Sequence, residues 1–355
     1  MKICLMCRQR NMETYGICPE CQKLNQTMRN LTCDFTGKFA VVTGGRIKIG
    51  YATALKLLRM GASVIIITRY PKSAFQNYQQ EPDFIEFQDR LFIIGFDLIR
   101  VDKIQDLIAQ IAFICNHKLD ILINNAAQTV KKSSDYYAKL ELQEQNLQIS
   151  YNQNILQLLE KQTQLFSLVP EQQIIDYGEQ PNTNSWVRKP EEISAQELLE
   201  VQLINVIAPF LLTNGLRYYL AYDNTSRKFV INVSSVEGRF HTKQKLARHV
   251  HTNMAKASLN MMTHSIASDF VRDKIYVYSC DPGWVSNQFP PAYQISKDFK
   301  PYLTFEDGAM RILYPILKNM FTTEKIKDYG MFYKDYKTPL DFNEALSRLN
   351  GSIDF

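Results

Sequence analysis

Apolar and polar positions follow one another along this chain in a regular order of short apolar runs and amphipathic stretches. Residues 38–43 and 62–68 are apolar runs that predict buried strands, and residues 51–59 between them have the spacing of a helix that ends at Gly61. A strand, a glycine turn, a helix and a second strand within about 30 residues make a βαβ unit. The pattern therefore predicts parallel strands.

The same alternation continues toward the end of the chain. Further strands are predicted at residues 90–97, 119–124, 229–233, 275–279 and 330–336. Helices are predicted at residues 103–116 and after the capping box Ser194-Ala195-Gln196-Glu197, and residues 341–355 are expected to form a polar helical tail. Apolar strands that alternate with helices indicate an α/β fold, a doubly wound parallel sheet of the Rossmann type with both faces covered.

Composition and charge exclude several classes of protein. Of the 355 residues 45% are hydrophobic and 22% are charged, and the net charge of +5 is too weak and too evenly spread to indicate a nucleic-acid partner. We find no apolar run of the roughly 18 residues that a membrane span needs, and no apolar secretory signal at the N-terminus. We therefore expect a cytoplasmic protein. A mitochondrial location is the alternative, because Lys2, Arg8 and Arg10 precede most of the acidic residues.

Four of the seven cysteines crowd into the first 21 residues as the pairs Cys4-x-x-Cys7 and Cys18-x-x-Cys21. A two-residue spacer lets both thiolates of a pair face one metal, and two pairs supply the four sulfurs that Zn²⁺ prefers in structural sites. We predict a small zinc knuckle over residues 1–33 whose folding depends on the metal. The alternative is a set of free thiols, or a disulfide, in an unstructured tail.

The turn between the first predicted strand and its helix is the candidate phosphate site. It reads Thr43-Gly44-Gly45-Arg46-Ile47-Lys48-Ile49-Gly50. Glycines let the backbone approach a pyrophosphate, and the helix N-terminus supplies N–H groups and the positive end of its dipole. A glycine turn alone is weak evidence, but its place between a strand and a helix strengthens it.

A glutamine-rich insertion over residues 129–185 interrupts the alternation. A segment of this length without regular structure is unusual inside a compact domain. Residues 155–165 are compatible with a helix, and residues 178–184 are predicted to be a loop. The insertion follows the fourth predicted strand at the carboxyl edge of the sheet, where ligands bind. It is either a lid over the site or a polar expansion without a role there.

Motifs in both halves resemble the short-chain dehydrogenase/reductase family over about residues 37–336, apart from the insertion. In the first half they are Thr43-Gly44 with Gly50, Asp97, and Asn124-Asn125-Ala126-Ala127. In the second half they are Asn205 in a predicted helix, Ser234-Ser235 after a strand, Thr252-Asn253-Met254-Ala255-Lys256, and Pro282-Gly283 after the next strand. The resemblance implies a nucleotide-dependent oxidoreductase that acts on a small-molecule carbonyl or alcohol.

The resemblance also assigns roles to residues. It implies that Asp97 meets the adenine, that the turn at Pro282 and Gly283 contacts the nicotinamide, and that Lys256 holds the nicotinamide ribose. The catalytic set maps onto Asn205, Ser235, Thr252 and Lys256. The cofactor set maps onto Thr43, Gly44, Arg46, Lys48, Ile49, Gly50, Arg69, Asp97, Asn125, Lys256, Pro282 and Gly283.

Three departures from the family pattern change the expectation. Lys48 stands where the middle glycine of the turn is usual, so its side chain either crowds the pyrophosphate or reaches a phosphate. Arg69 follows the second strand in place of an acid that would bind the ribose of NAD. A guanidinium there suits the 2′-phosphate, so NADP is preferred over NAD. Thr252 replaces the family tyrosine, and an aliphatic hydroxyl titrates far too high to act as the general acid.

These departures leave two functions open. The first is an NADP(H)-dependent oxidoreductase with an altered proton donor, for which His249, three residues before Thr252, is a candidate. The second is a catalytically weak dinucleotide-binding scaffold or sensor. The zinc knuckle is compatible with a homo-oligomer or a protein partner. The expected organisation is a knuckle at 1–33, a Rossmann-type domain at 34–340 and a tail at 341–355.

Overall fold

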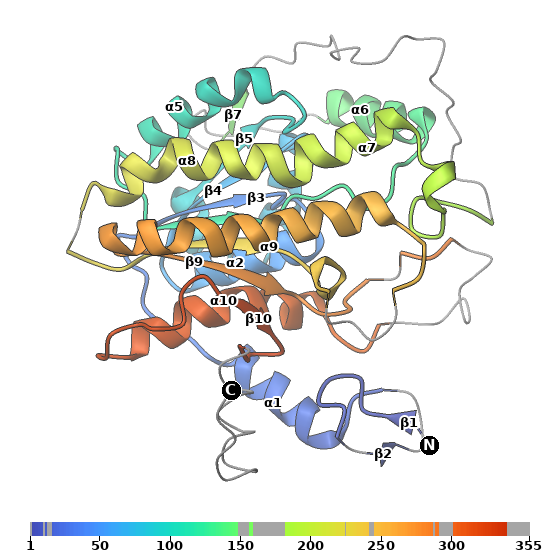
Figure 1. The fold of residues 1–355 in the computed structure, drawn as a ribbon. Helices are drawn as coiled ribbons and strands as arrows, with labels where there is room; N and C mark the ends of the chain where they lie inside the picture. Colours follow the sequence, from blue (N-terminus) through green and yellow to red (C-terminus); the bar gives the residue numbers. More distant parts are fainter. Residues whose placement is uncertain are drawn as a thin grey trace.

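The computed structural model folds around one parallel sheet (Figure 1). It describes residues 2–9, 11–12, 16–147, 156–158, 182–223, 225–240, 245–286, 288–290 and 301–338. Among these residues the sheet has eight strands in the order β7-β5-β4-β3-β6-β8-β9-β10, and each neighbouring pair is parallel. Its strands are β3 (Phe39–Thr43), β4 (Ser63–Thr68), β5 (Leu91–Gly95), β6 (Ile121–Asn124), β7 (Leu156–Leu158), β8 (Lys228–Val233), β9 (Ile275–Asp281) and β10 (Phe332–Lys334).

The predicted doubly wound sheet is confirmed, and each predicted strand is present with slightly different ends. One element was predicted wrongly. Residues 156–158 of the helix-compatible segment 155–165 form the edge strand β7, which pairs with β5. The edge of a sheet presents unpaired backbone N–H and C=O groups with which a passing segment can pair. The apolar spacing of a segment therefore does not determine whether it becomes an edge strand or a helix. The rest of that segment, and the tail 341–355, lie outside the described residues.

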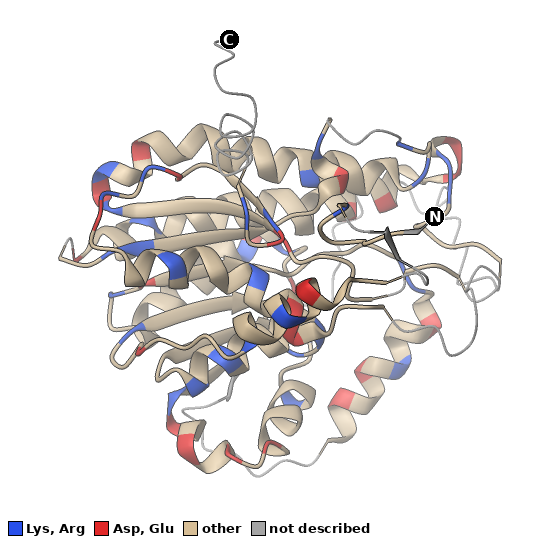
Figure 2. Cartoon of the chain, turned by 90° about the horizontal axis from the view of Figure 1, so that it is seen from below, with Lys and Arg blue, Asp and Glu red and all other residues tan. Residues whose placement is uncertain are grey.

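Helices cover both faces of the sheet, as the apolar strands require. They are α1 (Pro19–Arg29), α2 (Lys48–Arg59), α3 (Pro71–Gln79), α4 (Phe84–Phe87), α5 (Ile104–Ile114), α6 (Ser134–Asn146), α7 (Ala195–Gln202), α8 (Ala208–Ala221), α9 (Val250–Phe270) and α10 (Phe305–Phe321). The side chains of α2, α3 and α10 share one apolar core with the sheet, and those of α5, α8 and α9 share the other. Lysines, arginines and acidic residues are interspersed over the outer helices in Figure 2.

Helices α7 and α8 are joined by a π-helical stretch, Leu203–Ile207, into one continuous helix, Ala195–Ala221. By length and composition alone this helix could cross a membrane, which the sequence pattern did not indicate. Its apolar side chains Ala208, Leu212, Leu216 and Leu220 pack in the core under the sheet. Of the apolar window of this helix, 33% is buried in the structure.

A chain of buried polar side chains ties the central strands together. The Asn124 amide donates to Asn232 Oδ1 at 2.9 Å, and the Asn232 amide donates to Thr263 Oγ1 at 2.9 Å. Thr263 in turn lies 2.7 Å from the hydroxyl oxygen of Ser279. Buried amides and hydroxyls need such partners, and the chain fixes α9 against β6, β8 and β9.

The strand order places a crevice at the carboxyl ends of β3 and β6. Strand β3 pairs with β4 on one side and with β6 on the other, so the connections that leave the sheet at this point diverge. In open α/β sheets ligands bind at such a topological switch point. The glycine turn after β3 and the loop after β6 therefore face the same crevice.

The N-terminal segment packs against α10 and extends below the sheet in Figure 1. Strands β1 (Lys2–Ile3) and β2 (Asn11–Met12) form an antiparallel pair, and α1 follows. The fully buried guanidinium of Arg311 donates to Asn25 of α1 at 3.0 Å and to Asp335 beyond β10 at 3.2 Å. One cation therefore joins the first helix to the end of the sheet.

Candidate cofactor cleft and catalytic residues

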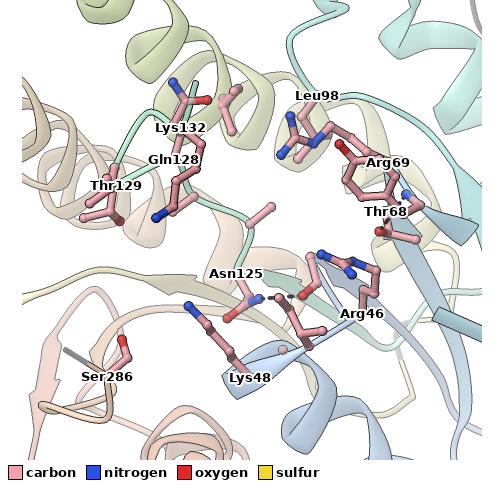
Figure 3. A pocket seen from close by; sticks show the side chains of 18 of the residues that line it. Arg46, Lys48, Thr68, Arg69, Leu98, Asn125, Gln128, Thr129, Lys132 and Ser286 are labelled. Atoms are coloured by element: carbon pink, nitrogen blue, oxygen red, sulfur yellow. Dashed lines mark hydrogen bonds between the residues drawn. The ribbon is translucent and has the colours of Figure 1, made fainter. Parts of the chain in front are cut away.

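A cavity of about 980 Å³ opens at the switch point, between the turn after β3 and the loops after β4, β5 and β6. Figure 3 shows Arg46, Lys48 and Arg69 around this hollow, with Asn125 and Gln128 on the opposite loop. Small-molecule sites are usually clefts of about 300–1,000 Å³. The cavity is therefore large enough for a dinucleotide.

The glycine turn has the tight geometry that a phosphate loop needs. Gly44 has a φ of +71°, and a Cβ built on Gly50 would lie only 2.2 Å from the carbonyl oxygen of Gly44. Lys48 also takes a left-handed φ, +58°, the conformation that glycine adopts without strain. Its exposed side chain lines the cavity, so the lysine keeps the backbone path of the turn.

Thr43 and Asn125 hold this turn to the loop after β6. The Thr43 hydroxyl oxygen accepts from the backbone N–H groups of Asn125 at 3.0 Å and Ala126 at 2.9 Å. The Asn125 side-chain amide donates back to the Thr43 carbonyl oxygen at 2.9 Å. Thr43 is buried and does not line the cavity, so its role is to position the turn.

The cavity gathers positive charge. Arg46, Lys48 and Arg69 line it, and in the described part of the chain none of them forms an ion pair with a carboxylate. Although the Lys48 side chain is open to solvent, partial desolvation by the cavity walls and the nearby charges of Lys132 and Arg46 lower its pKa. The charge of Asp97, in the same cavity, acts on Arg69, but three cations in one cavity still favour an anionic ligand.

The predicted adenine contact, Asp97, lies in the same cavity. It follows β5, and its carboxylate accepts from the backbone N–H of Ile99 at 3.1 Å. Pro282 and Gly283 do not line the cavity. Gly283 forms a turn after β9 with a φ of +81°, and its N–H donates to Asp281 Oδ1 at 2.8 Å. The lining residues of that loop lie just beyond this turn and are Ser286, Gln288, Phe289 and Pro290.

The predicted catalytic residues lie at the carboxyl end of β8 and on the helices beside it, largely buried. The Lys256 ammonium donates to the Val233 carbonyl oxygen at 2.7 Å, and Ser235 follows that strand. Asn205 lies in the π-helical stretch and bonds both backbone groups of Gln128, at 2.7 and 2.9 Å. It thereby fixes a loop that lines the cavity.

The catalytic cluster is separated from the cavity in this structure. Ser235, Thr252 and Lys256 are not among the residues that line the cavity. The Oγ1 atom of Thr252 is buried and has no hydrogen-bond partner among the residues that the structure describes. The Asn184 amide, from the end of the insertion, donates to the Gln288 carbonyl oxygen at 2.9 Å. Both residues line the cavity, so this hydrogen bond joins the end of the insertion to the loop after β9 within the cavity wall.

His249 begins α9 with a left-handed φ of +39° and stacks on Trp186, with ring centroids 4.0 Å apart. Its Nδ1 lies 2.8 Å from the Trp186 carbonyl oxygen, and its Nε2 lies 3.8 Å from the Glu237 carboxylate. The His249 ring and Lys245 lower the pKa of Glu237 to about 2. The backbone N–H of Glu237 donates to the Ser235 hydroxyl oxygen, so His249 and Ser235 flank the same residue.

A second buried cluster was missed at the sequence level. His251 Nε2 lies 3.4 Å from Glu197 Oε1, and Arg188 lies 3.7 Å from the other oxygen of that carboxylate. Burial opposes the ionisation of Glu197, but His251, Ser185 and Arg188 together lower its pKa. The predicted capping box is therefore half formed. Ser194 accepts from the Glu197 N–H at 3.1 Å, while the Glu197 side chain turns to His251.

The four N-terminal cysteines converge as predicted. Their sulfurs all lie within 4.8 Å of one another, with Cys4 to Cys21 at 3.8 Å and Cys7 to Cys18 at 3.9 Å. Tetrahedral zinc with sulfurs at about 2.3 Å requires sulfur pairs about 3.8 Å apart. Burial opposes ionisation of Cys4, but backbone N–H groups, that of Cys18 above all, lower its pKa to about 6. The donor set therefore fits a zinc ion.

Comparisons with known proteins agree with these motifs. A family model described as short chain dehydrogenase matches residues 38–168. An uncharacterized protein of Acanthamoeba polyphaga mimivirus is 32% identical over 94% of this chain and 74% of its own length. The chain belongs to the short-chain dehydrogenase/reductase family. A short chain dehydrogenase of Penicillium thymicola, penD, is 24% identical over 73% of this chain and 74% of its own length.

Solved structures of short-chain dehydrogenases share the fold. The NADPH-bound carbonyl reductase from chicken fatty liver is 18% identical, with a TM-score of 0.56, and the match covers 84% of this chain and 96% of that one. A short chain dehydrogenase from Burkholderia cenocepacia in complex with NADP is also 18% identical, with a TM-score of 0.54 over 79% and 91% of the two chains.

Within this short-chain dehydrogenase fold, the structure divides the predicted site residues into two groups. The cofactor residues that line the cavity together are Gly44, Arg46, Lys48, Ile49, Gly50, Arg69, Asp97 and Asn125. The catalytic residues form a separate buried cluster. Sequence reasoning missed Lys132, Tyr136 and Tyr137, which reach the cavity from the insertion. The helix-forming run of α6 after Ser133, an N-cap residue, was the available signal.

The buried ammonium of Lys256 should make stability depend on pH. Burial lowers the pKa of Lys256 from 10.5 to about 8, although Asp281 opposes this shift. Below pH 8 both folded and unfolded chains carry the proton, so the cost of burying the charge is fully present. Between pH 8 and 10.5 the folded chain loses a proton that the unfolded chain keeps, and stability rises with pH.

We expect Lys256→Met to be more stable than the wild type below pH 8, by at most about 3 kcal/mol. The difference should shrink as the pH rises from 8 to 10.5. Urea unfolding of both proteins across this range measures it, with Lys23→Met as the exposed control. A difference that stays constant with pH would contradict the burial of a charged ammonium.

Proposed function

We propose that this protein is an NADP(H)-dependent oxidoreductase that reduces a carbonyl or oxidises an alcohol. The observation that carries the proposal is Arg69, which stands at the carboxyl end of β4 and faces the cavity where an acid would favour NAD. Arg46 lines the same cavity and lies beside Ser73, to whose hydroxyl oxygen it donates at 3.3 Å. Two guanidinium groups that line one cavity suit the 2′-phosphate of NADP. The NADP(H) complexes among the fold neighbours support this choice.

Different residues of the cleft would bind different parts of the cofactor. The backbone of the turn at Gly44 and Gly50, together with the N-terminus of α2, would face the pyrophosphate. Lys48 would add a charge at the phosphates, and Asp97 would meet the adenine. When bound, the cofactor supplies or accepts the hydride.

The chain itself has to move one proton to or from the substrate oxygen. Ser235 would donate a hydrogen bond to that oxygen, because its own oxygen already accepts from the Glu237 N–H and its proton is free to turn. Thr252 cannot act as the general acid at working pH. His249 is the candidate donor, since imidazole is a common general acid and its ring lies beside Glu237, whose backbone N–H donates to Ser235.

Two observations favour a second function, a dinucleotide-binding scaffold or sensor. Thr252 replaces the family tyrosine, and Ser235, Thr252 and Lys256 do not line the cavity. Such a protein would bind NADP(H) without turning over a substrate, and the N-terminal knuckle would serve a partner or a second copy of the chain. Both functions require NADP(H) binding, so only a measurement of substrate turnover distinguishes them.

Removal of the Arg69 charge should weaken NADPH binding selectively. We expect Arg69→Ala to raise the Kd of NADPH about 10–100-fold, because hydrogen bonds to a charged group contribute about 1.5–3 kcal/mol. The Kd of NADH should change little. Fluorescence titration measures both, and Arg272→Ala, at a side chain 80% exposed, is the control. An equal loss for both nucleotides would place Arg69 away from the 2′-phosphate.

Turnover is tested by NADPH oxidation with a panel of aldehydes and ketones. We expect Ser235→Ala and His249→Ala each to lower kcat/KM about 100-fold, and Thr252→Ala to have little effect. The control variant Ser258→Ala should behave as the wild type. If NADPH binds but no carbonyl is reduced, the sensor function replaces the oxidoreductase.

We also propose that Cys4, Cys7, Cys18 and Cys21 hold a structural zinc ion. Cys18→Ser should lose the zinc that elemental analysis finds in the wild type, and its melting temperature should fall, since metal binding stabilises such small segments. The partly buried Cys33 lies outside the cluster, so Cys33→Ser is the control and should keep the metal. Purified wild type without zinc would remove this proposal.

A further inference from the structure

The insertion contributes a helix to the wall of the cofactor cleft. Helix α6 begins after Ser133, whose hydroxyl oxygen accepts from the Tyr136 N–H, and it lies beside α3. Tyr136, Tyr137 and Leu140 of this helix line the cavity, and Lys132 just before it lines the cavity as well. Figure 3 shows Lys132 at the rim of the hollow, across from Arg46.

One buried carboxylate fixes α6 to the neighbouring helix. Glu144 is only 6% exposed, and its two oxygens accept from the backbone N–H groups of Lys72 at 2.6 Å and Ser73 at 2.9 Å. These N–H groups belong to the first turn of α3 and have no partner within their own helix. A carboxylate there makes two charge-assisted hydrogen bonds and meets the positive end of the helix dipole.

A second contact reinforces this anchor. The Lys72 ammonium donates to the carbonyl oxygen of Leu147, just past the end of α6, at 3.1 Å. The exposed Glu141, one turn earlier on α6, makes no such contact with α3 among the described residues. Glu144 therefore sets the position of α6 relative to the first turn of α3.

The bonds of Glu144 to α3 also restrain the position of Arg69, because α3 begins only two residues after Arg69. The Arg69 guanidinium lies 5.5 Å from the ring centre of Tyr70 and 5.2 Å from that of Tyr137 on α6. A cation within about 6 Å of a ring face is attracted to it. Arg69 is thus held between a ring of the β4 loop and a ring of the insertion.

We propose that α6 is part of the cofactor site and that Glu144 is its positioning residue, so that Tyr137 holds Arg69 toward a 2′-phosphorylated adenosine. The inference rests on the proposed binding of NADP(H). It assigns the described part of the insertion to nucleotide selectivity. Residues 148–155 and 159–181 are not needed for it.

The direction in which NADPH affinity changes when Glu144 is removed distinguishes an anchoring role from a purely electrostatic one. Glu144 is an acid near the site of a phosphate, and it raises the pKa of Arg46 against the lowering effect of burial. If only charge mattered, removal of the carboxylate would strengthen NADPH binding. If Glu144 is an anchor, its removal weakens NADPH binding although a negative charge is lost.

The experiment compares Glu144→Ala with the matched control Glu141→Ala on the same helix. We expect Glu144→Ala to raise the Kd of NADPH about tenfold, to change the Kd of NADH less than threefold, and to speed amide hydrogen exchange at Lys72 and Ser73. Glu141→Ala should leave exchange unchanged and leave NADPH binding unchanged or slightly tighter. Tyr137→Leu, which keeps an apolar side chain, should lower the NADPH-to-NADH selectivity in the same direction as Glu144→Ala.

Other outcomes overturn the inference in distinguishable ways. Tighter NADPH binding in Glu144→Ala would make the carboxylate a competitor of the phosphate. Unchanged NADPH binding, or an equal loss of both nucleotides, would remove α6 from the selectivity of the site while the proposed function stands. A wild-type chain that binds neither nucleotide would end the proposed function, and this inference with it.

Discussion

The fit between the glycine turn and the loop after β6 is the constraint on which the site depends. Gly50 lies so close to the Gly44 carbonyl and the Asn125 amide that no side chain can be placed there. Thr43 and Asn125 then lock the two segments by reciprocal hydrogen bonds. Because β3 and β6 are neighbours in the sheet, this lock fixes the floor of the cavity before any nucleotide enters. A lysine within the turn is tolerated, since it needs only a left-handed backbone and an open direction for its side chain.

The catalytic residues match the family pattern less completely than the residues of the cofactor cleft do. Lys256 and Asn205 keep the contacts that hold β8 and the Gln128 loop in place. Where the family has a phenol, Thr252 has a buried hydroxyl that finds no hydrogen-bond partner among the residues that the structure describes, and this costs stability. In the cavity wall, a hydrogen bond from Asn184 to Gln288 joins the end of the insertion to the loop after β9.

The sequence allowed prediction of the sheet, the glycine turn and the cysteine cluster, because each depends on local spacing. The spacing of apolar residues indicates which strands and helix faces are buried. The spacing of the two Cys-x-x-Cys pairs indicates that four sulfurs can face one metal ion. The contacts of Glu144 and His251 could not be predicted this way. Glu144 is one glutamate among several polar residues of α6, and only the tertiary position of α3 makes it a cap. Glu197 had the spacing of a capping box, yet a buried histidine and arginine compete for its carboxylate, so tertiary pairing overrode the local pattern.

The Arg311 bridge has a consequence for biosynthesis. Asn25 and Arg311 are 286 positions apart in the chain, so the N-terminal helix emerges from the ribosome long before its docking partner exists. At about 5–20 residues per second the delay is roughly a quarter of a minute to a minute. During this interval the nascent N-terminus has to remain compact or protected without the rest of the protein. A metal captured by the four cysteines would give it a folded nucleus of its own, independent of the unfinished sheet.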